Sequence, residues 1–406
     1  MNGFHTRREQ FLMEFLGYTR PDGSAGIRNY VVVIPPVRCS NELAWTIAEG
    51  VNGVVPLLHN HACARIGPDV ERAKKTLIGL GSNPNVAGVL VAGIGCENIL
   101  PDDLAADIAK SGKPVECVSI EKEGNFQAAV ERGQKAARSM MDRACRAPRQ
   151  PQPLSKLQIG VKCGGSATIS SLAGHPATGL VLDALIRAGG TAMFTETAEV
   201  IGAEHIMARR ATNKQVRDRL IEVVGRFEKM IADYGVDIRG SQPSPGNMKS
   251  GLSTLEEKSL GAMHKTGSMP LAGVLEYAEK PTIAGLHLMD CSSWTSQLML
   301  GMAAAGCNIF VFSVGGGLPA KSRSQPGMGR VPIIPVVKVT GNPTLKEEMD
   351  YFDLYAGTII EGSENVEQVG DRLLGEMLDV ASGKPSRQEY SRYTEVLDMY
   401  GTGPLM

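Results

Sequence analysis

The sequence is poor in aromatic residues and carries almost no net charge. Only 5% of its 406 residues are Phe, Trp or Tyr, and the formal net charge at pH 7 is −1. A nearly neutral chain produces no field that attracts nucleic acid or an anionic membrane. Few aromatic side chains are available to stack on unpaired bases. We therefore expect no nucleic-acid partner.

Long apolar runs are also missing. The chain has no uninterrupted apolar stretch of about 18 residues, the length that a membrane-spanning helix needs. The first residues, MNGFHTRREQFLMEF, lack the apolar core of a signal peptide. We expect no membrane partner and a cytoplasmic location. There, the eight cysteines are more typical of free, buried or metal-bound thiols than of disulfides.

Three common binding motifs are absent as well. The loop KCGGSAT (162–168) lacks the GxxxxGK[ST] spacing of a P-loop. The segment SVGGGLPAKSRSQPG (313–327) lacks the GxGxxG fingerprint of a dinucleotide site. The segment HNHACAR (59–65) has no second close cysteine pair, so its spacing matches no standard zinc finger.

What the sequence does contain is a regular alternation of apolar strand patterns and amphipathic helix patterns. Apolar runs at 30–36, 51–59, 86–95 and 115–120 alternate with helical patterns, and the alternation restarts after the Pro-rich stretch 147–156. This order predicts an α/β fold with two Rossmann-like α/β domains and mostly parallel sheets. We expect an N-terminal extension (1–16), a first α/β domain (17–150) and a second α/β domain with C-terminal helices (151–406).

Cysteines follow several of the predicted strands. In α/β folds ligands bind at the carboxyl ends of the strands, and thiolate and imidazole both suit iron or zinc. Simple burial of a small apolar side chain is the alternative for each cysteine. The predicted metal ligands are Cys39, Cys63, Cys96 and Cys163.

Acid–base candidates lie in the same places. His61 is part of HNHACAR, Glu97 adjoins Cys96, and Glu196 and Glu199 directly follow the predicted strand GTAMFTE. Carboxylates at a strand end are candidates for proton transfer or metal binding. His205 lies in the next, charge-rich segment. The alternatives are a packed turn for Glu97 and a solvated charged helix face for residues 204–210.

Residues that would bind an anionic substrate form a third group. The glycine-rich loop after Lys162 exposes backbone amides that can bind a carboxylate, and lysines of the polar segment 241–261, Lys249 and Lys258, can add positive charge. The predicted substrate-binding residues are Lys162, Gly164, Gly165, Ser166, Arg209, Asn247, Lys249 and Asp290.

Taken together, these motifs resemble the altronate/galactarate dehydratase family, which includes the large subunit of sulfolactate sulfo-lyase. The resemblance extends from about residue 17 to residue 385. It rests on GYTRPDGSAGIRNYVVVIPPVRCSN, GSNPNVAGVLVAGIGCEN, KCGGS, GGTAMFTETAEVIGAEHIMARRA, SQPSPGN, GLSTLEEKSLGA and VVKVTGNP. Cys39, Cys63 and Cys96 match cysteines of the dehydratases, whereas MDCSS (289–293) is closer to the sulfo-lyase branch. Ala167 stands where the family's usual CGGSD has an acid.

The resemblance implies a lyase that performs metal-dependent dehydration of a sugar acid, an aldonate or aldarate, to a 2-keto-3-deoxy acid. The implied cofactor is iron, either as Fe²⁺ or as a 4Fe–4S cluster. One alternative is sulfo-lyase-type elimination of sulfite from a 2-hydroxy-3-sulfonate. Another is a large subunit that needs a separate small β-rich subunit, and a third is a non-catalytic scaffold. We also expect a hydroxy-acid substrate and a homo-oligomer.

Overall fold

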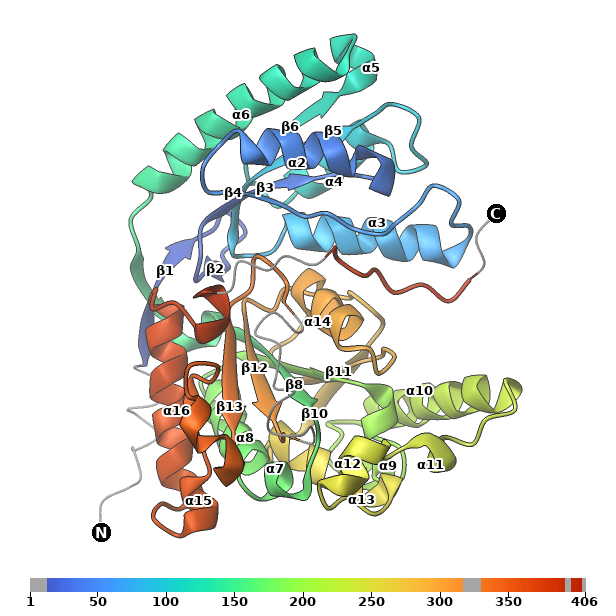
Figure 1. Ribbon diagram of the computed structural model, residues 1–406, viewed down its shortest axis with the longest axis vertical. Coiled ribbons are helices and arrows are strands. Elements are labelled where there is room, and N and C mark those ends of the chain that lie inside the picture. Colours follow the sequence, from blue (N-terminus) through green and yellow to red (C-terminus); the bar gives the residue numbers. More distant parts are fainter. Residues whose placement is uncertain (1–12, 317–329, 391–395, 404–406) are drawn as a thin grey trace.

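The computed structural model describes residues 13–316, 330–390 and 396–403. It contains two parallel β-sheets covered by helices, one above the other in Figure 1, so the predicted α/β class is confirmed. Residues 1–12 of the predicted N-terminal extension lie outside the described residues. Residues 14–16 of that extension begin a strand.

The first sheet has four parallel strands in the order β4-β3-β5-β6. Its strands are β3 (Tyr30–Ile34), β4 (Val54–Pro56), β5 (Val86–Gly93) and β6 (Val115–Ser119). The helices of this domain are α2 (Asn41–Glu49), α3 (Pro68–Gly81), α4 (Pro101–Ala109), α5 (Ile120–Glu123) and α6 (Phe126–Arg146).

Alternate residues of β3 enter two different cores. Val31 and Val33 pack with α2 and α6, whereas Val32 and Ile34 pack with α3 and α4. This division follows from the two-residue period of a strand, which points successive side chains to opposite faces. Both faces are covered, which explains why the predicted strands read as continuous apolar runs.

The second sheet has seven parallel strands in the order β10-β11-β9-β8-β12-β13-β14. Its strands are β8 (Gln158–Gly164), β9 (Thr191–Thr195), β10 (Leu271–Leu275), β11 (Gly285–Met289), β12 (Ile309–Val314), β13 (Val336–Thr340) and β14 (Leu354–Tyr355). The chain first adds β9 on one side of β8 and later adds β12 on the other. The strand order therefore reverses at β8, and such a switch point is where open α/β sheets bind ligands.

Helices cover both faces of the larger sheet and extend beyond its carboxyl edge (Figure 1). They are α7 (Thr168–Leu172), α8 (Gly174–Arg187), α9 (Glu204–Arg209), α10 (Lys214–Asp233), α11 (Ile238–Ser241), α12 (Pro245–Lys249), α13 (Leu255–Met263), α14 (Thr295–Ala304), α15 (Thr358–Glu361) and α16 (Val366–Ala381). Short 3-10 helices include Arg38–Ser40, Thr197–Glu199 and His264–Thr266. The stretch Thr168–Arg187 is apolar enough in composition to cross a membrane, but 67% of its most apolar window is buried, as in a core helix.

The Pro-rich stretch 147–156 is not only a connection between the domains. Within it, β7 (Gln150–Pro153) pairs antiparallel with β1 (Glu14–Thr19), which also pairs with β2 (Ala25–Gly26). Residues 150–153 of this stretch thus form a regular strand although their composition is rich in proline. Two strands far apart in the sequence supply each other's hydrogen bonds there, a partnership that local composition does not reveal.

The two domains are packed tightly against each other. Helix α3 approaches α14 so closely that a Cβ on Gly79 would lie 2.2 Å from the carbonyl oxygen of Ala304, which explains the glycine. The buried Asn83 amide donates to the carbonyl oxygens of Ala303 (2.8 Å) and Cys307 (2.9 Å). Residues 396–403 also run along this boundary beside α3 (Figure 1).

Candidate active site

Two buried ion pairs lie at the carboxyl edge of the larger sheet. Lys162, near the end of β8, pairs with Glu196, the first residue after β9. Lys265, in the 3-10 helix His264–Thr266, pairs with Glu199. All four side chains are at most 5% exposed. Burying four charges costs free energy even when they are paired, so such a group at a switch point indicates a functional site.

A third lysine adds positive charge to this group. Lys258 lies on α13, is 9% exposed, and donates to the side-chain oxygen of Gln242 (3.0 Å). The Thr254 hydroxyl accepts from the amide of Glu257 (3.1 Å) and caps the start of α13. The sequence analysis named Lys249 and Lys258 as sources of positive charge. The charge of Lys258 acts on both glutamates and lowers their pKa values.

The two glutamates differ in their protonation behaviour. Burial, and then the charge of Glu199, raise the pKa of Glu196 despite the opposing effect of Lys162. Burial alone would raise the pKa of Glu199, but the ammonium groups of Lys265, Lys162 and Lys258 lower it below its usual value. Glu199 therefore stays ionised, whereas Glu196 holds a proton more readily than an ordinary glutamate does. Two neighbouring carboxyl groups whose pKa values are shifted in opposite directions are typical of acid–base sites.

The loop KCGGS lies beside these charges. The thiol of Cys163 is 3.2 Å from the hydroxyl oxygen of Ser166, and the Asn247 amide donates to the Ser166 carbonyl oxygen (2.9 Å). Gly165 has a left-handed backbone (φ 56°), which requires glycine, and is exposed, while Gly164 is half-buried. The structure thus brings together five predicted substrate-binding residues: Lys162, Gly164, Gly165, Ser166 and Asn247.

His175 and Lys265 belong to the same group but were missed by the sequence analysis. The Nδ1 atom of His175 is 2.9 Å from the Gly261 carbonyl oxygen, and Nε2 has no hydrogen-bond partner among the described residues. Burial, and then the charge of Lys265, lower the pKa of His175 to about 4, so the ring is neutral. Neither residue follows a strand pattern, and no motif signals them. Only the packing of α8 against residues 264–266 brings them to the site.

Three predicted residues face solvent instead. His205 and Arg209 are both exposed on α9, whose buried residue is Met207. Residues four apart lie on the same face of a helix, so His205 and Arg209 both point toward solvent. Arg209 lines a separate surface hollow with Lys214. Lys249, the last residue of α12, is also exposed.

Asp290 follows β11 directly and is half-buried, and both of its carboxylate oxygens have protein partners. One carboxylate oxygen accepts from the Thr197 hydroxyl (2.5 Å), and the other accepts from the Arg226 guanidinium (2.6 Å). The side chain of Asp290 therefore stabilises the loop that carries Glu196.

The predicted metal ligands do not form one group. Cys39, Cys63 and Cys96 follow β3, β4 and β5 of the smaller sheet, and all three are exposed. Their loops touch: the Arg38 amide donates to the His61 carbonyl oxygen (2.7 Å), and the Asn98 side chain donates to the Cys63 carbonyl oxygen (3.2 Å). Nevertheless, residues 13–316, 330–390 and 396–403 contain no group of three His, Cys, Asp or Glu residues that could hold a metal ion.

Cys163 is separated from these three cysteines because it lies in the larger sheet. Burial, and then the charge of Glu199, raise the pKa of its thiol. Cys163 thus belongs to a different sheet from the other three cysteines, and its role as a metal ligand stays a prediction.

His61 and Glu97 occupy the carboxyl edge of the smaller sheet, and both are buried. Burial, and then the charge of Arg65, lower the pKa of His61. Glu97 accepts hydrogen bonds from the backbone amides of Ile94 and Gly95 (2.7 Å for Gly95). Glu97 thus stabilises its own turn, which was the alternative weighed against a role as an acid or base.

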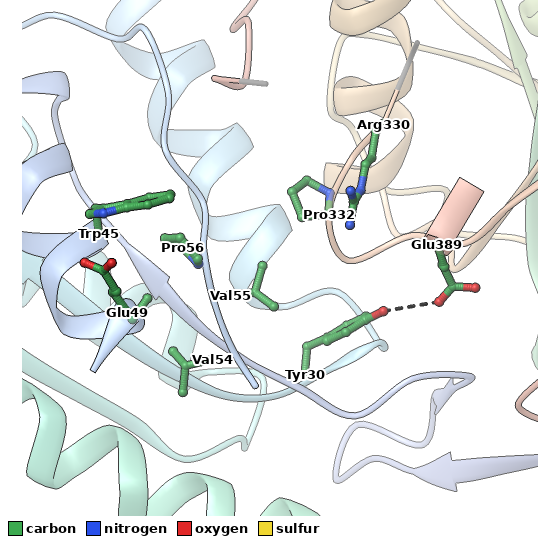
Figure 2. Close-up of a pocket in the computed structure, with 10 residues that line it drawn as sticks. Tyr30, Trp45, Glu49, Val54, Val55, Pro56, Arg330, Pro332 and Glu389 are labelled. Atoms are coloured by element: carbon green, nitrogen blue, oxygen red, sulfur yellow. Dashed lines mark hydrogen bonds between the residues drawn. The ribbon is translucent and has the colours of Figure 1, made fainter. Parts of the chain in front are cut away.

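A cavity of about 490 Å³ lies elsewhere, at the junction of β4 with residues 330–332 and 389 (Figure 2). Trp45 and Glu49 project toward it from α2, and the Tyr30 hydroxyl points to Glu389 (3.4 Å). None of the predicted site residues lines this cavity. The buried lysines and glutamates therefore remain the better candidate for chemistry.

Comparison with known proteins identifies the family of the chain. The family model described as "D-galactarate/Altronate dehydratase, C-terminal" matches residues 154–401, and "D-galactarate dehydratase/Altronate hydrolase, second domain" matches residues 17–145. The chain is 36% identical over 378 residues to (2R)-sulfolactate sulfo-lyase subunit beta of Chromohalobacter salexigens, covering 92% of this chain and 94% of that protein.

Two dehydratases are similar over a comparable share of the chain. Altronate dehydratase of Bacillus subtilis is 32% identical over 397 residues, covering 94% of this chain and 76% of that enzyme. Galactarate dehydratase (L-threo-forming) of Escherichia coli is 33% identical over 399 residues, covering 91% of this chain and 73% of that enzyme.

Proposed function

The chain belongs to the D-galactarate/altronate dehydratase family and is a hydro-lyase of that type, and we propose that it dehydrates an aldonate or aldarate to a 2-keto-3-deoxy acid. The observation that carries this proposal is the buried group of three lysines and two glutamates at the switch point of the larger sheet. A non-catalytic scaffold would have no use for charges that are so costly to bury.

Dehydration of a 2,3-dihydroxy acid requires a base and a means to stabilise negative charge. In the proposed reaction the base removes the proton from C2, the C3 hydroxyl leaves as water, and the resulting enol becomes the 2-keto acid. Glu196 suits the base because its pKa is raised. The ammonium groups of Lys162, Lys258 and Lys265 suit binding of the substrate carboxylate and of the charge that develops on it.

Replacement of Glu196 tests the assignment of the base. Glu196→Gln keeps the shape of the side chain but cannot accept the C2 proton. The rate of 2-keto acid formation from aldonates and aldarates should fall by about 10²- to 10⁴-fold, the usual contribution of a general base. His205→Gln is a matched control, because His205 is exposed on α9. Equal activity of Glu196→Gln and the wild type would exclude Glu196 as the base.

A second candidate function is elimination of sulfite from a 2-hydroxy-3-sulfonate. Its support is the 36% identity to a sulfo-lyase subunit over 94% of that protein. We also propose, from the same similarity, that a separate small subunit assists the reaction. Assays should therefore measure sulfite and 2-keto acid in parallel, with the chain alone and with a candidate small subunit. Sulfite release without 2-keto-3-deoxy acid would replace the dehydratase assignment.

Iron is a further proposal, supported by the three touching loops that carry Cys39, Cys63 and Cys96. Their exposed thiols do not form a closed set of ligands among the described residues, so we assign no step of the reaction to the metal. Protein purified without oxygen should contain iron. About four irons with acid-labile sulfide indicate a cluster, and one iron without sulfide indicates Fe²⁺. Absence of iron in active protein would overturn the proposal.

A further inference from the structure

Glu196 has an unusual backbone conformation. Its φ is 76° and its ψ is 77°, which places a residue with a side chain in the left-handed region. A non-glycine residue there is strained, and such strain persists only where the surrounding structure holds it. The proposed base is therefore held at its position against the preference of its own backbone.

The residues on either side of Glu196 are fixed to the end of β11. Thr195 and Met289 are the last paired residues of β9 and β11, and the Thr195 hydroxyl donates to the Met289 carbonyl oxygen (2.8 Å). Beyond the strands, the Thr197 amide donates to the Cys291 carbonyl oxygen (3.2 Å). The Cys291 amide in turn donates to the Thr197 hydroxyl (3.3 Å).

The Thr197 hydroxyl also donates to Asp290 (2.5 Å), and this bond extends the support to another helix. The second oxygen of Asp290 accepts from Arg226 of α10 (2.6 Å), which also pairs with Glu276. Thr197 is completely buried, so its hydroxyl has no access to solvent. Asp290 thus connects the strained segment to α10 through two charge-assisted hydrogen bonds.

We propose that Asp290 and Thr197 are positioning residues that hold Glu196 in its strained conformation, toward Lys162. This inference rests on the proposed function, since it assumes that Glu196 is the base. It assigns to Asp290 a role different from substrate binding. Loss of the Thr197 hydroxyl should misplace Glu196 and lower kcat, with little effect on KM, because Thr197 is completely buried and both carboxylate oxygens of Asp290 already have protein partners.

The test compares Thr197→Val, which removes the hydroxyl at nearly constant shape, with Thr197→Ser, which keeps it. Thr197→Val should lower kcat about 10- to 100-fold, the scale of a misplaced catalytic group, with KM within twofold of the wild type. Thr197→Ser should restore most of the rate. Asp290→Ala should resemble Thr197→Val, and Asp290→Asn, which still offers an oxygen to Thr197, should lose less.

Two controls separate positioning from general damage. Thr46→Val removes a hydroxyl that bonds within α2 (2.8 Å) in the other domain and should leave kcat unchanged. A crystal structure of Thr197→Val should show Glu196 with a negative φ and its contact with Lys162 lost. The conformation of Glu196 can be read from this crystal structure even if the wild-type protein dehydrates no sugar acid. In that case only the proposed function fails. An unchanged Glu196 conformation and kcat in Thr197→Val would overturn the inference.

Discussion

The carboxyl edges of the two sheets occupy equivalent places in their folds but differ in how their side chains are enclosed. In the larger sheet, Lys162, Glu196 and Glu199 are buried and paired beneath residues 242–266. In the smaller sheet, Cys63 and Cys96 are exposed, although the nearby His61 and Glu97 are buried. The residue type at a strand end therefore does not decide its chemistry by itself. The segment that covers the edge determines which groups are desolvated and which of them change their pKa.

The largest expected effect comes from breaking one buried pair at the larger sheet. Lys265→Met leaves Glu199 buried without a partner and should lower the free energy of unfolding by about 3–5 kcal/mol. The double variant Lys265→Met/Glu199→Gln removes both charges and should recover most of that loss. Denaturant unfolding measures both. A single variant as stable as the wild type would show that Glu199 does not depend on Lys265 for its stability in the folded protein.

The pH dependence of catalysis provides a second test of whether the carboxyl groups of the larger sheet are buried and coupled. A base must be deprotonated, and the pKa of Glu196 is raised above 4.5, so the acidic limb of kcat/KM should lie above pH 4.5 and activity should rise through it. Because Glu199 contributes to that increase, Lys265→Met/Glu199→Gln should move the limb to lower pH. A limb that stays in place, or moves to higher pH, would contradict the coupling between the two carboxyl groups.

The smaller sheet offers a contrasting test with a smaller effect. Glu97→Ala removes the acceptor of two backbone amides and should lower the free energy of unfolding by about 1–3 kcal/mol. The exposed Glu131→Ala in α6 serves as the matched control. If Glu97 is instead an acid or base, the variant loses activity without losing stability. Measuring unfolding and turnover on the same preparations distinguishes these outcomes.

The sequence predicted most of the fold because its signals are local. Alternating apolar runs and helical patterns are enough to indicate parallel sheets, and the strand ends led directly to Lys162, Glu196 and Glu199. Lys265 could not be found in this way, since its partner Glu199 lies 66 residues away and packing alone joins them. His205 was misplaced for a related reason: the composition of α9 does not show which of its faces is buried. The pairing of β1 with β7 is another long-range contact without a local signal.

The smallest effect on stability is expected at the exposed cysteines. Cys63→Ser should change the free energy of unfolding by no more than about 0.5 kcal/mol, as is usual for surface positions. In the native protein a thiol reagent should modify Cys39, Cys63, Cys96 and Cys145 quickly, and Cys163, Cys291 and Cys307 only after unfolding. Prior addition of Fe²⁺ without oxygen should protect the first three.

Cys145 is the internal control for this experiment, because it is exposed at the end of α6 and is not a proposed ligand. Equal labelling of all four exposed cysteines with and without iron would contradict iron binding at the smaller sheet. Protection of Cys39, Cys63 and Cys96 alone would show that the metal orders thiols that the chain leaves apart. The two edges would then differ in timing: the larger sheet pairs its charges on folding, and the smaller sheet gathers its ligands only on metal binding.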